Sequence, residues 1–129
     1  MNLPKTIKIG GHNYEVIFPY VFTERNDLNG DIDDNKKIIR LVGSIEGEKR
    51  VDSALMVTLI HEILHGLDHT TGQRMFAGDE GEKKIEALSE GIYQVLVVNG
   101  YLPNGLEINK NNNYNMTNTE ETTLRSKRV

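Results

Sequence analysis

The chain contains no cysteine. Disulfide bonds and thiolate metal sites are therefore excluded, and any bound metal ion must be held by histidine, aspartate or glutamate side chains. Long apolar runs are also missing. No stretch has the length of a membrane span, and the start of the chain lacks the hydrophobic segment of a signal peptide. We therefore expect a cytoplasmic protein without a membrane partner.

An excess of positive charge is missing as well. The 129 residues include 15 lysines and arginines against 19 aspartates and glutamates, which gives a formal net charge of −4. No long basic run interrupts this acidic balance, so we expect no nucleic-acid partner. A chain of this length is typical of a single domain with a modest hydrophobic core.

The first part of the chain has the pattern of β-strands. Residues 5–18 alternate apolar and polar side chains around Gly10-Gly11, a pair that favours a tight hairpin turn because glycine tolerates positive φ. Turn-forming residues then separate two short strand-like segments, 30–33 and 37–41. These patterns predict a small antiparallel sheet of hairpins, with strand 37–41 at an edge where an extended substrate could pair.

A helical pattern replaces the strand pattern at residues 52–69. Its apolar side chains cover nearly the whole circumference, which is typical of a buried helix. After residue 108 the chain is rich in asparagine and threonine and has almost no core residues, so burial cannot offset the entropy of ordering it. We therefore expect one α+β domain over residues 1–108, with the sheet packed on the helices, and a disordered polar tail over residues 109–129.

A second helix is expected over residues 80–99. Asp79 and Glu82 have the spacing of a capping box, which would place both of them at the start of this helix. The helix has a core stripe that includes Leu88 and Val95, and a neighbouring stripe that carries glutamates. The second helix therefore brings carboxylates close to the first one.

The first helix contains the motif His61-Glu62-Ile63-Leu64-His65. Two histidines at this spacing share one helix face, about 6 Å apart along the axis, and can bind one zinc ion. Glu62 is rotated by about 100° from His61 and reaches the open side of the ion, where it can act as the general base for a zinc-bound water. The buried helix strengthens this hypothesis, because buried polar side chains are costly unless something satisfies them.

A catalytic zinc ion requires a third protein ligand. His69 continues the spacing but lies about 12 Å along the axis from His61, which is too far for the same ion. A metzincin site would need glycine at position 68 and histidine at position 71, whereas the chain has Asp68 and Thr71. Glu86 of the second helix remains, because it falls on a half-apolar stripe where a divalent cation would satisfy its carboxylate.

Two further residues of the second helix are candidates for supporting roles. Glu90 lies one turn from Glu86, and its carboxylate could accept the second N–H of a ligand histidine and fix the orientation of that ring. The alternative for Glu90 is a solvent-facing charge. Tyr93 is a candidate to contact the substrate or its oxyanion, with simple packing as the alternative.

Three segments of the chain, "LNGDIDDNKKIIRL", "LIHEILHGLDH" and "KKIEALSEGIYQVL", occur in this order. Together they resemble the small phage and prophage metallopeptidase-like proteins related to the ImmA/IrrE family, over roughly residues 6–100. The resemblance implies a zinc ion held by the two histidines of the motif and Glu86, with Glu62 as the base. It also implies a phage or prophage protein that acts in the bacterial cytoplasm on a repressor-type regulator.

The helix that carries the third ligand departs from related patterns at one position. "IEALSE" is similar to the helix of thermolysin-like gluzincins, in which a ligand glutamate is followed four residues later by an aspartate. The ImmA-type proteins usually have asparagine at this later position. Here it is Glu90.

Two functions are consistent with these features. The first hypothesis is a zinc metallopeptidase that carries one zinc ion per chain and hydrolyses a protein or peptide substrate, with Glu62 activating the zinc-bound water. The alternative is a zinc-binding phage protein without proteolytic activity that binds a host or phage factor. Glu62 favours the enzyme, because a structural zinc site needs no base and usually has four protein ligands.

Overall fold

The computed structural model describes residues 3–102 of the chain. The polar tail expected at residues 109–129, and with it the domain boundary expected at residue 108, lies outside the described residues. None of the helices in the described part is long and apolar enough to cross a membrane.

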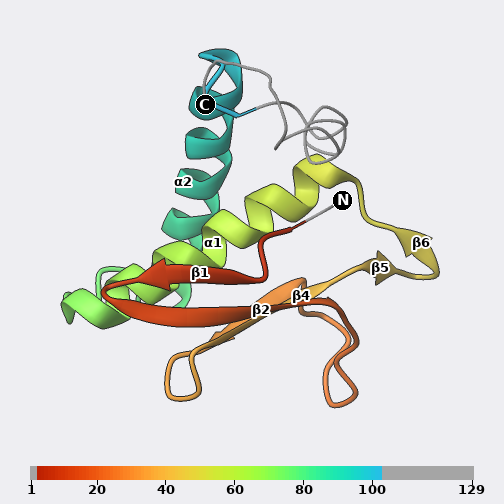
Figure 1. Ribbon diagram of the computed structural model, residues 1–129, viewed down its shortest axis with the longest axis horizontal. Coiled ribbons are helices and arrows are strands. Elements are labelled where there is room, and N and C mark those ends of the chain that lie inside the picture. Colours follow the sequence, from red (N-terminus) through yellow and green to blue (C-terminus); the bar gives the residue numbers. More distant parts are fainter. Residues whose placement is uncertain (1–2, 103–129) are drawn as a thin grey trace.

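The described part of the chain forms a four-stranded sheet, a small two-stranded hairpin and two helices (Figure 1). In chain order the elements are β1 (Thr6–Ile9), β2 (His12–Tyr20), β3 (Gly30–Asp33), β4 (Ile38–Val42), β5 (Ser44–Ile45), β6 (Glu48–Lys49), α1 (Asp52–Thr71) and α2 (Gly78–Val98).

The four-stranded sheet is mixed, with the strand order β1-β2-β4-β3. β1 pairs with β2 and β3 pairs with β4 in antiparallel fashion, but β2 and β4 run parallel. The expected α+β fold is confirmed, whereas the expectation of an entirely antiparallel sheet is wrong. The reason is the connection over residues 21–29, which carries the chain to the far edge before β4 returns beside β2 in the same direction.

The edges of this sheet are β1 and β3. The segment expected at an edge, residues 37–41, corresponds to β4, which is paired with β2 on one side and with β3 on the other. The prediction that this segment is free to pair with a substrate is therefore wrong. The free edge on that side of the sheet belongs to β3.

The hairpin of β1 and β2 turns at Gly10 and Gly11, as expected. Both glycines have positive φ, of 59° and 84°. A two-residue turn with positive φ at both positions matches the twist of the flanking strands, and side chains other than glycine adopt it only with strain. The turn fixes the register in which Ile7 lies opposite Tyr14.

The main hydrophobic core lies between the sheet and α1. Its buried members come from the strands and from this helix, and they are Ile9, Tyr14, Ile39, Leu41 and Leu59. In Figure 1, α1 runs along one side of the sheet, and α2 rises past α1. The core therefore fixes α1 on the sheet, and α1 in turn supports α2.

The face that α2 buries is narrower than its sequence pattern predicted. The buried residues of this helix are Gly81, Ile85 and Ser89, which follow one another at intervals of one turn. Leu88 and Val95, expected in the core stripe, are 45 % and 56 % exposed. The difference arises because α2 packs mainly on α1 and not on the sheet, so only one stripe of its surface is covered.

The expected capping box at the start of α2 is absent. The residue that precedes the helix is Ala77, and no side chain caps the free N–H groups of its first turn. Asp79 therefore lies in the uncapped first turn and Glu82 lies about one turn inside the helix, so the carboxylate of Glu82 is left for contacts with α1.

Asp68 organises the connection between the two helices. This buried carboxylate of α1 accepts hydrogen bonds from the backbone N–H groups of Met75 at 2.7 Å and Phe76 at 2.9 Å, which lower its pKa. Gly81 packs directly on the backbone of Phe76, where a Cβ atom would lie 2.1 Å from the carbonyl carbon. These contacts fix the first turn of α2 relative to the end of α1.

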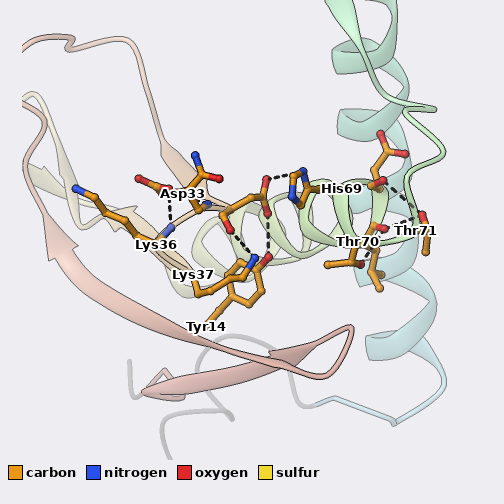
Figure 2. A network of polar contacts seen from close by, with 11 residues as sticks. Tyr14, Asp33, Lys36, Lys37, His69, Thr70 and Thr71 are labelled. Carbon is orange, nitrogen blue, oxygen red and sulfur yellow. Dashed lines mark hydrogen bonds and ion pairs between the residues drawn. The ribbon is translucent and has the colours of Figure 1, made fainter.

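A polar network ties the β3–β4 turn to β2 and α1. The hydroxyl of Tyr14 donates a hydrogen bond of 2.9 Å to Asp34 Oδ1, and Asp34 Oδ2 lies 3.8 Å from Nδ1 of His69. Figure 2 shows Tyr14 and His69 approaching this turn from β2 and from α1. Burial, together with the carboxylate of Asp34, raises the pKa of Tyr14 to about 12.

Replacement of Tyr14 by phenylalanine tests this network. The Tyr14→Phe variant keeps the buried ring but removes the hydrogen bond to Asp34, so we expect the free energy of unfolding to fall by about 1–2 kcal/mol. Urea denaturation measures the change. The same replacement at Tyr101, whose side chain is 74 % exposed, should change stability by less than about 0.5 kcal/mol. Equal effects at both positions would show that the hydrogen bond contributes nothing.

Candidate metal centre

Two histidines of α1 present their rings on the same face of the helix. The ring centroids of His61 and His65 are 4.9 Å apart. The side chains are 15 % and 26 % exposed, so both rings are partly withdrawn from water but remain accessible from one side. The four-residue spacing predicted this arrangement, because it depends only on the geometry of one helix.

A carboxylate from α2 faces both rings. Oε1 of Glu82 lies 2.6 Å from Nε2 of His65, and Oε2 lies 3.3 Å from Nε2 of His61. One ligand atom from each of the three residues falls within a span of 4.8 Å. Donor atoms around a tetrahedral zinc ion are separated by about 3.3 Å. Small side-chain movements would therefore place all three atoms around one ion.

Electrostatics favour the form of His61 that binds metal. Burial lowers the pKa of this ring, and the carboxylate of Glu82 offsets only part of that effect. His61 is therefore neutral at neutral pH. A metal ion needs the neutral form, because the lone pair of the ring nitrogen makes the bond.

Glu62 is the least satisfied charged group near these histidines. Its side chain is 5 % exposed. Within residues 3–102 its carboxylate makes neither a hydrogen bond nor an ion pair. Burial and the nearby carboxylates of Asp31, Glu82 and Asp34 raise its pKa to about 8. A buried carboxyl group without a partner is costly, and a cation beside it would remove most of that cost.

These four residues line one cavity of about 930 Å³. Its walls come from three parts of the fold, namely α1 with Arg50 just before it, the first turns of α2, and β3 with the residues that flank it. The cavity is large enough for a small peptide segment, since ligand sites commonly have volumes of about 300–1,000 Å³. The candidate metal centre is therefore open to a ligand.

The residues present fit a divalent cation. Two imidazoles and a carboxylate are a common donor set for a catalytic zinc ion, which uses three protein ligands and keeps one position open. Glu62 supplies an independent argument, because its buried carboxylate has no partner among the described side chains. The structure thus contains a group of His61, His65 and Glu82 that could hold a metal ion.

The other residues proposed from the sequence lie outside the group formed by His61, His65 and Glu82. Glu86 and Glu90 are exposed on α2 and line the same cavity, one and two turns beyond Glu82. Neither belongs to the group of three close donor atoms, and the ligand role of Glu86 stays a prediction. Tyr93 is not among the residues that line this cavity, and burial, together with the carboxylate of Asp52, raises its pKa.

Glu82 is the site residue that the sequence interpretation missed. Its spacing from Asp79 predicts a capping box, but no side chain caps α2. A signal was present in the spacing, because residues 82, 86 and 90 all carry glutamate and share one stripe of the helix. Which of the three faces the histidines depends on where α2 crosses α1.

Comparison with models of known protein families, with curated proteins and with solved structures finds no match to this chain. The resemblance to the ImmA/IrrE family therefore stays a prediction. The structure supports it as far as a helix with an H-E-x-x-H motif and a second helix that brings an acid to the two histidines.

Removing the charge of Glu62 should stabilise the metal-free protein. The pKa of this carboxyl group is about 8 in the folded chain and 4.5 without perturbation. Its contribution to the free energy of unfolding is therefore highest below about pH 4.5, where the group is protonated in both states, and it falls as pH rises from there through about 8, because the group loses its proton more readily in the unfolded chain than in the folded one. The gain in the Glu62→Gln variant should therefore be small at about pH 4.5 and reach a few kcal/mol at about pH 8.

Urea denaturation in the presence of a chelator measures this difference. Glu80→Gln is the control, because Glu80 is an exposed glutamate of α2 that contacts Lys83 and does not line the cavity. A gain that does not grow with pH would contradict the description of Glu62 as a buried carboxyl group without a partner.

Proposed function

We propose that the protein is a zinc-dependent hydrolase of peptide bonds, of the H-E-x-x-H type. The observation that carries the proposal is a buried, unpartnered Glu62 beside two histidines and an acid, at the wall of a cavity that can hold a peptide. Each part has a role in peptide hydrolysis, and a purely structural site would not need an acid of this kind.

The chemistry that zinc supplies when bound is Lewis acidity, which acidifies water and polarises the scissile carbonyl. The residues of the chain then carry out the proton transfers. Glu62 accepts a proton from the attacking water and passes it to the leaving amine. Its surroundings suit this role, because burial makes the carboxylate a stronger base than an exposed one.

For the third ligand we propose Glu82, because it is the acid closest to both histidines. Glu86, which the resemblance implies, is the alternative one turn further along α2. Glu90 lies another turn away, where it can contact the substrate or accept a hydrogen bond. His61 and His65 belong to the site under either assignment.

The edge strand β3 offers a place for an extended substrate. Its residues Gly30, Asp31 and Ile32 line the cavity, and β3 pairs with β4 on its other side only. A peptide that adds to this edge would run along the wall that β3 forms beside α1, near His61 and His65. Backbone hydrogen bonds would supply affinity without selecting a side chain.

The alternative function, a zinc-binding protein without proteolytic activity, is less well supported. A structural zinc site usually has four protein ligands, whereas three close donors lie here beside an open cavity. The biological setting follows from the resemblance alone: a phage- or prophage-encoded protein of the bacterial cytoplasm, with a repressor-type regulator as its substrate.

Zinc affinity of two variants tests the ligand assignment. Glu82→Gln should lower the affinity by at least about 100-fold, because it removes a charged ligand, whereas Glu86→Gln should lower it by less than about tenfold. Competition with a chelating dye gives both values, and Glu80→Gln on the same helix is the matched control. If Glu86→Gln loses the metal and Glu82→Gln keeps it, the ligand is one turn further along α2.

Hydrolysis by the Glu62→Gln variant tests the enzymatic role. The amide has the shape of the carboxyl group but cannot accept a proton, so we expect normal zinc content and cleavage slower by about 10²–10⁴-fold. Mass spectrometry of an unstructured peptide library, incubated with each protein, measures the cleavage. Wild-type protein with chelator is the control, and equal cleavage by wild type and variant would place the base elsewhere.

A further inference from the structure

Arg50 brings a positive charge into the wall of the same cavity. It directly precedes Val51 and the first turn of α1, and it lines the cavity together with His61 and Glu62. Neither the proposed metal centre nor the proposed base needs an arginine at this position. The burial and the contacts of its guanidinium therefore require an explanation.

The guanidinium is held by neutral acceptors from three parts of the fold. One terminal nitrogen donates to the carbonyl oxygens of Asn29 and Val42, at 3.2 and 3.1 Å. The other donates to the carbonyl oxygen of Ala54 at 3.3 Å and to the hydroxyl of Thr58 at 2.6 Å. These bonds use all four terminal N–H groups and fix the guanidinium in place, whereas its Nε–H donates a hydrogen bond to none of residues 3–102.

No carboxylate of the described residues neutralises the charge of Arg50. Within residues 3–102 the guanidinium of Arg50 has no acidic group at ion-pair distance, in contrast to Arg25 and Arg40, which pair with aspartates. Burial alone lowers its pKa, with no acidic neighbour to raise it. An arginine that is partly buried without a counter-charge is costly unless an anion binds there.

The charge also lies close to the proposed metal centre. Thr58, which accepts the shortest of these hydrogen bonds, is three residues before His61 and on the same side of α1. That separation corresponds to about 4.5 Å along the helix axis. Acidic side chains line much of the rest of the cavity, and they are Asp27, Asp31, Asp34, Glu62, Glu82, Glu86 and Glu90. An anion in the cavity is therefore favoured only directly beside Arg50.

We propose that Arg50 forms an anion subsite that binds a carboxylate of the substrate, either the C-terminal carboxylate of a peptide or an acidic side chain. The inference deepens the proposed function and rests on it, because it assumes that the cavity receives a peptide. Arg50 is then a specificity-determining residue. The Nε–H is the donor left for the carboxylate, and a guanidinium already fixed by four hydrogen bonds loses little freedom when the carboxylate binds.

In the part of the chain that the structure describes, Lys83 is the only other lysine or arginine that lines this cavity. Its side chain is 76 % exposed, and its ammonium lies 3.6 Å from the carboxylate of Glu80. Water and this neighbour screen its charge, so it should contribute little to anion binding. Lys83 therefore supplies a matched control for Arg50, with the same charge at the same cavity but without the burial.

Peptide titrations followed by amide NMR spectra test the proposal. The protein is the zinc-loaded Glu62→Gln variant, which avoids turnover of the probes. The probes are acetyl-trialanine with a free carboxylate, the same peptide as its amide, and acetyl-Ala-Ala-Glu-amide. We expect the free acid, or the glutamate peptide, or both, to bind at least about tenfold more tightly than the trialanine amide.

The variants then assign the preference to a residue. Arg50→Gln should reduce the ratio of acid to amide affinity to about one, Arg50→Lys should retain part of it, and Lys83→Gln should leave it unchanged. A folding defect in Arg50→Gln would weaken the binding of all three peptides alike, so it would not alter the ratio. A carboxylate held by the zinc ion alone would keep its advantage in the Arg50→Gln variant.

Two results would overturn the anion subsite: equal affinity for all three peptides, undetectable binding included, or an acid preference that survives in Arg50→Gln. Which probe binds more tightly distinguishes a C-terminal carboxylate from an acidic side chain. The proposed function fails separately. If the preference depends on Arg50 but wild-type protein cleaves no peptide, the cavity recognises carboxylates without hydrolysing peptides.

Discussion

The desolvation of Glu62 is the constraint on which the candidate site depends. A carboxyl group that is 5 % exposed, with a pKa raised to about 8, destabilises the helix that carries it unless a positive charge is nearby. The fold places two histidines on the same helix and an acid opposite them. Together these three side chains could bind a metal ion, which would supply the positive charge. A residue that lowers the stability of the metal-free fold is expected where function requires a strong base in a dry place.

The fold could be predicted from the sequence as far as local patterns determine it. The Gly10-Gly11 hairpin, the strand of residues 30–33 and both helices depend on neighbours along the chain, and the structure confirms them. Strand order could not be predicted in this way, because it depends on contacts between segments that are far apart in the sequence. The parallel pairing of β2 with β4 and the edge position of β3 left no local signal.

The candidate site also has a part that local sequence determines and a part that depends on how the helices pack. His61, Glu62 and His65 could be predicted because their arrangement follows from one helical repeat. The acid that completes the group of three could not be predicted. Residues 82, 86 and 90 present equivalent carboxylates about 6 Å apart along the axis, and only the crossing of α2 over α1 selects one of them. That crossing is set by Asp68 and Gly81, which fix the connection between the helices through backbone contacts that no composition or periodicity reveals.

The two charged ends of the cavity constrain how a peptide would lie in it. An extended chain advances about 3.3–3.6 Å per residue, and Thr58, which holds the guanidinium of Arg50, is about 4.5 Å along α1 from His61. If the C-terminal carboxylate binds at Arg50, only one or two residues fit between it and the bond at the metal centre. The upstream residues of the peptide would then pass the acidic end, near Glu82 and Asp34. A C-terminal carboxylate at Arg50 would therefore favour removal of short C-terminal pieces, whereas an acidic side chain at Arg50 would be compatible with cleavage within a long chain.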